Sequence, residues 1–181
     1  MTFQPTFING LYVIELDLFR DERGWFARTF CKEEFKKAGF DNEWVQMNHS
    51  FTIQKGTLRG MHFQFPPYSE IKMVRCIAGS VFDVAIDLRK NSATFLQWFG
   101  IEISAENKKM ILIPDGFAHG FQTLQNNCEL IYHHTNFYTL EAEGGIKYND
   151  PGIGIKWPLP VNEISKKDDN YAYLNENFKG I

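Results

Sequence analysis

Short runs rich in β-branched and aromatic residues recur along the chain, and residues that favour turns separate them. The runs lie at residues 11–17, 72–77, 81–88, 98–103, 110–113 and 130–132. Turn signals between them include DERG at 21–24, Pro66-Pro67, RKNS at 89–92 and PDG at 114–116. Many short strands with no long amphipathic helix between them are typical of an antiparallel sandwich or barrel. We therefore predict an all-β fold of the jelly-roll kind and not a parallel βαβ fold.

Only two short helices are expected outside these runs. One covers residues 32–38 (KEEFKKA) and ends at Gly39, and the other is a single turn after Ser104, whose hydroxyl could cap it. The segment from Asn162 onward is polar and is expected to fold over the body of the protein. Because no repeat, linker or low-complexity tract divides the chain, we predict one domain, 1–181.

Composition narrows the classes of protein that the chain can be. Its 181 residues, 44% of them hydrophobic, suffice for a core without metal or disulfide staples. A net charge of −3 without any basic run argues against nucleic acid and membrane surfaces as partners. The sequence has neither an apolar stretch of about 20 residues nor a leader-like N-terminus. Cys31, Cys76 and Cys128 lack paired spacing, so we expect a cytoplasmic protein whose cysteines are structural thiols.

Two histidine-containing segments are the best candidates for chemistry. In LRGMHFQ at 58–64, strand alternation places His62 and Gln64 on one face, toward the interior of the barrel, and Met61 and Phe63 on the other. In PDGFAHG at 114–120, the Pro-x-Gly-x-x-His spacing that ends at His119 resembles the second signature of the cupin jelly rolls. The two segments together predict a cupin-type barrel with histidines facing inward.

The residues of these segments disfavour a metal site. Metal-binding cupins use two histidines and a carboxylate from the first segment and the histidine of the second, which are ligands that first-row divalent metals prefer. Here Gln64 stands in place of the second histidine, and Lys72, about ten positions after His62, would repel a dication. We therefore predict that the protein uses neither a metal nor another cofactor.

The same positions suit acid–base chemistry without a metal. His62 can serve as a general base or acid near neutral pH, and Lys72 supplies a fixed positive charge for an oxygen that becomes negative. This combination favours proton abstraction beside a carbonyl, through an enolate. An inversion also needs a proton donor on the far face of the carbanion, for which Tyr132 is the candidate.

Over nearly its whole length the sequence resembles the nucleotide-sugar 3,5-epimerases of the dTDP-4-dehydrorhamnose 3,5-epimerase family. The matching segments are DERGWF at 21–26, QMNHS at 46–50, residues 58–64, KMV at 72–74, DVAIDLR at 83–89, residues 114–121, Tyr132, NDP at 149–151, WP at 157–158 and SKKD at 165–168. The resemblance implies a homodimeric cupin without metal. It also implies an epimerase that inverts C3, C5 or both in a nucleotide-diphosphate sugar, a 4-keto-6-deoxyhexose of deoxysugar biosynthesis, as in dTDP-rhamnose and O-antigen synthesis.

The resemblance also implies roles for individual residues. His62 matches the general base, Asp168 the carboxylate that orients it, Lys72 the cation that stabilises the enolate, and Tyr132 the acid on the opposite face. The residues expected to bind substrate are Arg23, Arg59, His119 and Lys167 at diphosphate or sugar oxygens, Gln46, Asn48 and Gln64 in the cleft, Phe26 and Tyr138 as stacking partners, and Arg28. At Arg28 the family most often carries a glutamate that contributes to the nucleotide end, so a CDP-linked or GDP-linked substrate is an alternative to a dTDP-linked one.

Other readings stay open from the residues alone. A metal-dependent cupin, such as an isomerase or dioxygenase, would contain stoichiometric metal, and a sugar-binding cupin without catalysis would bind ligand without exchanging its hydrogens. His49, His133 and His134 are expected to make ordinary hydrogen bonds in strands or loops. Most of the 17 Phe and four Trp residues are expected in the core.

Overall fold

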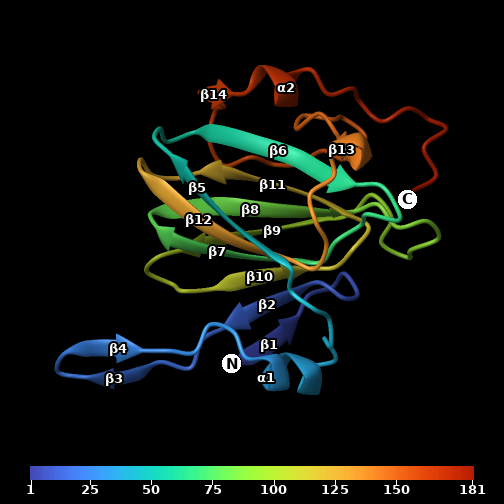
Figure 1. The fold of residues 1–181 in the computed structure, drawn as a ribbon. Helices are drawn as coiled ribbons and strands as arrows, with labels where there is room; N and C mark the ends of the chain where they lie inside the picture. The colour runs from blue at the N-terminus through green and yellow to red at the C-terminus, as the bar shows by residue number, and fades with distance from the viewer.

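Two sheets make up most of the protein in the computed structural model, which describes residues 1–181 (Figure 1). The first sheet has the strand order β1 (Thr2–Pro5), β2 (Tyr12–Glu15), β10 (Met110–Ile113), β7 (Lys72–Ala78), β12 (Cys128–His134), β5 (Gln46–Thr52). The second has the order β13 (Glu143–Gly145), β6 (Thr57–Gln64), β11 (Phe117–Thr123), β8 (Ser80–Asp87), β9 (Trp98–Ser104), with β14 (Glu163–Ile164) also beside β6. All pairings are antiparallel except that of β14 with β6. The predicted all-β jelly-roll architecture is confirmed.

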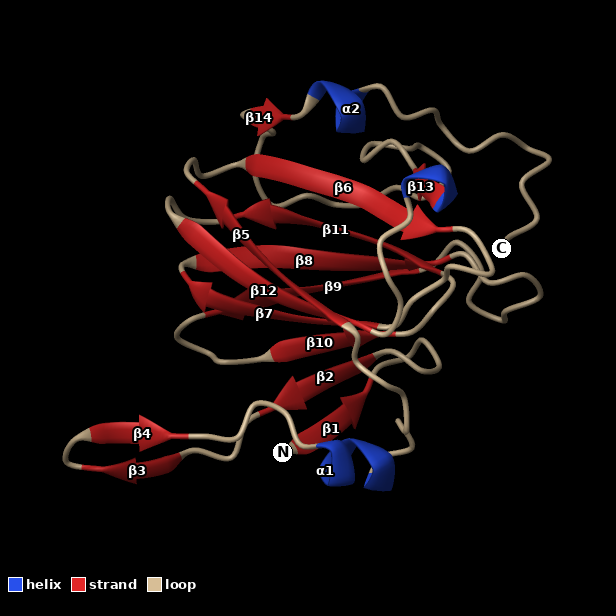
Figure 2. Ribbon diagram, viewed as in Figure 1, coloured by secondary structure: helices blue, strands red, loops and turns tan.

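Helical structure is sparse, as the strand-rich sequence predicts (Figure 2). The helix expected at 32–38 is α1 (Lys32–Lys37), and the other helical elements are η1 (Leu140–Ala142) and α2 (Lys166–Asp169). The helical turn expected after Ser104 is wrong: this segment is a plain turn, in which the Ser104 hydroxyl accepts a hydrogen bond from the Asn107 amide at 2.9 Å. No helix is long and apolar enough to cross a membrane.

A core cluster of 13 buried residues fills the space between the two sheets. It combines inward-facing positions of both sheets, namely Val74, Cys76, Ile111, Ile113, Cys128 and Leu130 from the first and Val81, Ala85, Ile103, Phe117 and Phe121 from the second, with Ile8 and Leu11. All three cysteines are free thiols, as expected.

The C-terminal segment covers the outer face of the second sheet, which confirms its expected course. Leu174, Phe178 and Ile181 of the segment from Asn162 pack against the apolar cluster that contains Met61 and Phe63 of β6. In the same segment, β14 pairs in parallel with the start of β6, and the Ile181 amide donates to the Leu88 carbonyl at 2.8 Å. This path brings α2 alongside β6, 106 residues away in sequence.

A two-stranded hairpin, β3 (Phe19–Asp21) and β4 (Gly24–Phe26), stands apart from both sheets (Figure 1). Its turn is the predicted turn at 21–24. Phe19 and Phe26 on this hairpin are among the most exposed large hydrophobic residues of the chain, and Phe26 is 72% exposed. The hairpin therefore presents apolar surface that this chain does not cover.

Candidate active site

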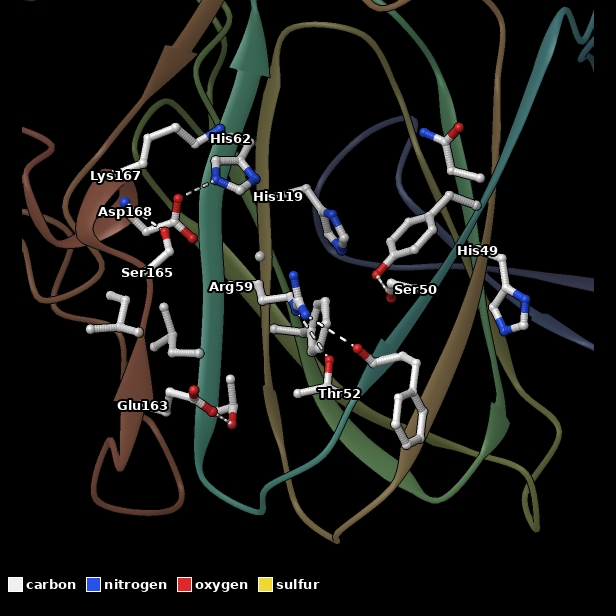
Figure 3. A pocket seen from close by; sticks show the side chains of 18 of the residues that line it. His49, Ser50, Thr52, Arg59, His62, His119, Glu163, Ser165, Lys167 and Asp168 are labelled. Carbon is white, nitrogen blue, oxygen red and sulfur yellow. Dashed lines mark hydrogen bonds and ion pairs between the residues drawn. The ribbon is translucent and has the colours of Figure 1, made fainter.

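A cavity of about 580 Å³ opens between the two sheets. Its walls come from both of them, with β6 and β11 on one side, β5, β7 and β12 on the other, and the C-terminal segment at the edge (Figure 3). The candidate site residues that line it are Asn48, Arg59, His62, Lys72, His119, Tyr132, Lys167 and Asp168. Residues scattered over more than a hundred positions of sequence thus meet in one space.

His62 and Asp168 form a hydrogen-bonded pair at one wall. Strand alternation turns His62 toward the cavity while Met61 and Phe63 join the apolar cluster on the other face of β6, as predicted. Asp168 on α2 is 3% exposed, and its Oδ1 lies 2.8 Å from Nε2 of His62. Its Oδ2 accepts a hydrogen bond from the Gly60 amide at 3.0 Å. Both carboxylate oxygens are therefore occupied.

The electrostatics of this pair define the tautomer of His62. Although burial raises the pKa of Asp168, the hydrogen bonds from His62 and Gly60 hold it below its usual value. An ionised carboxylate can only accept, so Nε2 of neutral His62 carries the ring proton. The Nδ1 lone pair is then left for a proton from the cavity side (Figure 3). This is the arrangement of a general base with an orienting carboxylate.

Gly60 allows β6 and β11 to approach closely behind the pair. Its φ is +119°, and a Cβ at this position would lie 2.7 Å from Cα of Gly120 and 2.8 Å from the His119 carbonyl oxygen. The strand register shifts between His119 and Phe121 at the same place, and His119 pairs with His62 across the strands. Only a glycine satisfies both the positive φ and the contact distance.

His119 has a buried aspartate partner of its own. Its Nε2 lies 2.9 and 3.0 Å from the two carboxylate oxygens of Asp83, which is fully buried on β8. Asp83 lies within the DVAIDLR segment that matches the family, but its hydrophobic surroundings resemble any buried strand. Its pairing with His119 could be seen only once β8 was placed beside β11.

Tyr132 and Lys72 occupy the opposite wall, on neighbouring strands of the first sheet. The Tyr132 hydroxyl is 2.9 Å from Oγ of Ser50, and burial raises the pKa of Tyr132 well above its usual value, so the phenol keeps its proton. The Lys72 ammonium is 3.1 Å from Oε1 of Glu70. A proton donor and a cation thus face the His62 wall.

Polar side chains that could hold an anionic ligand line the rest of the cavity. Arg59 uses Nε and Nη2 to donate to the Thr52 hydroxyl and the Phe51 carbonyl, at 3.1 and 3.3 Å. Lys167 is paired with Glu143 at 2.6 Å, and burial lowers its pKa while that ion pair raises it, with a raised net value. Both cations are oriented by neighbouring side chains.

Three predicted ligands lie behind or beside the cavity, not on its wall. Gln64 is 5% exposed, and its amide is used by the backbone, because it donates to the Tyr68 and Phe137 carbonyls and accepts from the Thr139 amide. Gln46 donates to Asn48 at 3.3 Å and accepts from the Tyr138 amide at 3.1 Å. The Tyr138 hydroxyl donates to Glu143 at 3.1 Å. These side chains organise the loop after β12 and do not enter the cavity.

Arg23, Phe26 and Arg28 lie outside the cavity of this chain altogether. Arg23 pairs with Asp21 within the exposed hairpin at 2.5 Å. Arg28 pairs with Glu34 of α1 at 2.5 Å. The charge at Arg28 is therefore neutralised locally, which gives a structural reason for an arginine at this position.

Several residues that shape the site were not among the predicted site residues, although Ser50 and Asp83 lie in segments that match the family. They are Ser50 and Thr52 on β5, Glu70 in the loop before β7, Asp83 on β8 and Glu143 on β13. Each hydrogen-bonds to a cavity residue on another element of the fold, so only the tertiary structure reveals the contact. No group of three or more His, Cys, Asp or Glu side chains is arranged to hold a metal ion.

Known proteins resemble this chain in sequence and in fold over nearly its whole length. The family model described as dTDP-4-dehydrorhamnose 3,5-epimerase matches residues 5–176. The enzyme of that name from Shigella flexneri is 46% identical over 94% of both chains. The crystal structure of the same enzyme from Elizabethkingia anophelis, 39% identical, superposes with a TM-score of 0.93 over 98% of both chains. The Legionella pneumophila dTDP-6-deoxy-D-glucose-3,5-epimerase, solved in complex with dTDP-4-keto-L-rhamnose, is 42% identical, with a TM-score of 0.87 over 92% of this chain and 89% of that one. With the family model spanning nearly the whole chain and the site built from its motifs, the chain belongs to the dTDP-4-dehydrorhamnose 3,5-epimerase family.

Proposed function

We propose that the protein inverts C3 and C5 of a dTDP-linked 4-keto-6-deoxyhexose, as a step in deoxysugar biosynthesis. The observation that carries this proposal is the pairing of a histidine–aspartate base with a protonated phenol on facing walls of one cavity. Family membership supports the reaction class, and the dTDP-keto sugar bound to the Legionella relative supports the substrate class.

The residues have complementary roles in the proposed reaction. Hydrogens on C3 and C5 are acidic because both carbons adjoin the C4 ketone. Nδ1 of His62 removes the proton, the electron pair of the C–H bond forms a C=C bond to C4, and the π electron pair of the ketone moves to the C4 oxygen to give an enolate. Lys72 stabilises the negative oxygen, and Tyr132 donates its proton to the opposite face of the carbon. Solvent then reprotonates the phenol and takes up the proton from His62, with Ser50 hydrogen-bonded to the phenol throughout.

Substrate binding is proposed to rest on the cavity cations. Arg59 offers a planar guanidinium suited to diphosphate oxygens, and Lys167 and His119 lie at the same cavity. Asn48 supplies an amide to the sugar end. We propose no binding role for Gln64, because its polar atoms are already satisfied by the backbone.

The hairpin residues support a homodimer in which each cavity is completed by the partner. Arg23 and Phe26, expected at the substrate, lie on a hairpin that projects from this chain with its apolar side chains exposed. We propose that β3 and β4 of one protomer cover the cavity of the other. Mixed dimers of His62→Ala and Arg23→Ala chains should then regain about a quarter of wild-type activity, because half of the dimers have one intact site of two. Absence of any recovery in mixed dimers would count against this arrangement.

Hydrogen exchange into the sugar tests the proposed reaction. A dTDP-linked 4-keto-6-deoxyglucose is incubated with catalytic protein in deuterated water, and NMR follows the hydrogens at C3 and C5. Deuterium at both positions supports double epimerisation, and deuterium at only one indicates a mono-epimerase. If neither position exchanges, the CDP-linked and GDP-linked sugars are tested, and silence with all three favours a binding protein. Activity lost to a chelator, with stoichiometric metal by elemental analysis, would favour a metal-dependent cupin.

We further propose that residues 1–181 act as one cytoplasmic domain. Support for one domain comes from the C-terminal segment, which contributes both Asp168 to the site and a strand beside β6. Support for the cytoplasm comes from the buried thiols of Cys76 and Cys128, which remain unpaired.

A further inference from the structure

A buried carboxylate that has no role in the reaction proposed above lies beside Lys72. Glu70 is in the loop between β6 and β7. Its Oε1 is 3.1 Å from the Lys72 ammonium, and its Oε2 is 2.7 Å from Nδ1 of His134 on β12. The side chains of Glu70, Lys72 and His134 are 8%, 12% and 9% exposed. A carboxylate so far from water requires partners of this kind.

Glu70 itself does not line the cavity, whereas Lys72 and His134 do. Any effect of Glu70 on a ligand in the cavity must therefore pass through those two side chains. Because one carboxylate oxygen faces each of them, Glu70 bridges two neighbouring strands of the cavity wall.

The backbone fixes the position of this carboxylate. The Ile71 amide donates to the Thr135 hydroxyl at 2.9 Å, and the Thr135 amide donates to the Ile71 carbonyl at 3.1 Å. These two bonds lock the residue after Glu70 to the residue after His134. The carboxylate is thus held by the fold and does not depend on a flexible loop.

The hydrogen bonds also define the charge of His134. Oδ1 of Asn48 accepts from Gln46 at 3.3 Å, so its Nδ2 is the atom that faces Nε2 of His134, also at 3.3 Å. An amide NH2 can only donate, and Nε2 therefore carries the lone pair while Nδ1–H donates to Glu70. With His134 neutral, the negative charge of Glu70 is directed at Lys72. Although burial raises the pKa of Glu70, the His134 hydrogen bond and the Lys72 charge hold it below its usual value.

We propose that Glu70 is a positioning residue, which together with His134 holds the Lys72 ammonium in place against the oxygen of the developing enolate. The proposal rests on the proposed function for the identity of the reaction. A lysine has a flexible four-carbon stem, so without an anchor its ammonium must be ordered during each turnover. A cation already fixed by Glu70 stabilises the transition state without that cost.

Steady-state kinetics on the dTDP-linked keto sugar test the proposal. Glu70→Gln keeps the shape and removes the charge, and it should lower kcat about 10–100-fold with KM within about threefold, as expected for a misplaced catalytic group. The double variant Glu70→Gln, Lys72→Ala should be no slower than Lys72→Ala alone, within about threefold, because Glu70 acts through Lys72. A wild-type kcat in Glu70→Gln, or fully multiplicative losses in the double variant, would overturn the proposal.

Two further variants separate positioning from folding. Glu15→Gln breaks another glutamate–lysine pair of the first sheet, with Lys109 at 3.4 Å, and should keep kcat within about twofold. Glu70→Asp keeps the negative charge on a side chain that is one methylene shorter. It should therefore recover part of the kcat lost in Glu70→Gln. If Glu70→Gln does not fold, Glu70→Asp replaces it, both alone and combined with Lys72→Ala. Glu70→Asp alone should then lower kcat about 3–10-fold.

A crystal structure of Glu70→Gln decides the matter without turnover. The Lys72 ammonium should move by about 1 Å or more from its wild-type position, a displacement that matters for catalysis. An unchanged ammonium would overturn the positioning role. Lack of activity in the wild-type protein would instead count against the proposed function, and the position of the ammonium would still decide this inference.

Discussion

Replacing Asp168 by asparagine should invert the tautomer of His62, because the surrounding hydrogen bonds dictate how the new amide sits. The Gly60 amide, 3.0 Å from Oδ2, can only donate, so the asparagine must present its oxygen there. Its NH2 group then faces Nε2 of His62, which is 2.8 Å from the other carboxylate oxygen. Nε2 must become an acceptor, and the ring proton moves to Nδ1. The nitrogen proposed to take the proton of the sugar is then already protonated.

The expected loss is large because nothing replaces the carboxylate. Asp168 is 3% exposed, so water cannot substitute for it. A wrong histidine tautomer in a comparable base–carboxylate pair costs about 10⁴ in kcat, which corresponds to about 5 kcal/mol in the activation free energy. We expect kcat of Asp168→Asn to fall about 10³–10⁴-fold, with KM within about threefold.

The assay is deuterium incorporation at C3 and C5, followed by NMR at several substrate concentrations. Asp169→Asn is the matched control, since Asp169 is the next residue of α2, is exposed and pairs only with Lys147, at 3.1 Å. It should keep kcat within about twofold. A kcat for Asp168→Asn within tenfold of wild type, in a folded protein that binds dTDP normally, would refute the tautomer argument.

Three further predictions concern proton donation, acid stability and strand packing. Tyr132→Phe should abolish inversion. Because burial raises the Tyr132 pKa, wild-type kcat should not fall through loss of the phenol proton between about pH 8 and 10; a phenol that ionises in this range by ultraviolet difference absorbance, and whose signal is absent in Tyr132→Phe, would contradict this. Although burial raises the pKa of Asp87, hydrogen bonds from Arg89, Ser92 and Thr94 lower it to about 2. The ionised Asp87 carboxylate therefore stabilises the fold above its unfolded pKa near 4, and this stabilisation is lost as the pH falls toward 2. Urea unfolding should show that wild type exceeds Asp87→Asn in free energy of unfolding by about 2 kcal/mol less at pH 2 than at pH 7. An equal difference at both pH values would argue against this role of Asp87. Gly60→Ala should lower the melting temperature and reduce kcat more than tenfold, because its Cβ would lie 2.7 Å from Cα of Gly120; a variant with wild-type stability and kcat would show that β6 can shift freely.

Local patterns in the sequence determined the fold class and the centre of the site. Period-2 alternation around His62 correctly placed Met61 and Phe63 in an apolar cluster and His62 at the cavity. Runs rich in β-branched and aromatic residues located β2, β7, β8, β9, β10 and β12, because buried strands show continuous apolar character. Strand β5 was not anticipated, since it is an edge strand with mostly exposed side chains. The order of the motifs was sufficient to identify the family.

The tertiary structure alone decided which side chains meet. The partner of His62 lies 106 residues away, and without the family motif only the placement of α2 beside β6 distinguishes Asp168 from its neighbour Asp169. Glu70 and Asp83 have roles set entirely by residues on other strands. Gln64 was predicted from strand alternation to face the interior, but the backbone of the loop after β12 hydrogen-bonds to its amide. Alternation is a property of one strand and can be read locally, whereas hydrogen-bond partners depend on register and loop paths, which are set by packing over the whole chain.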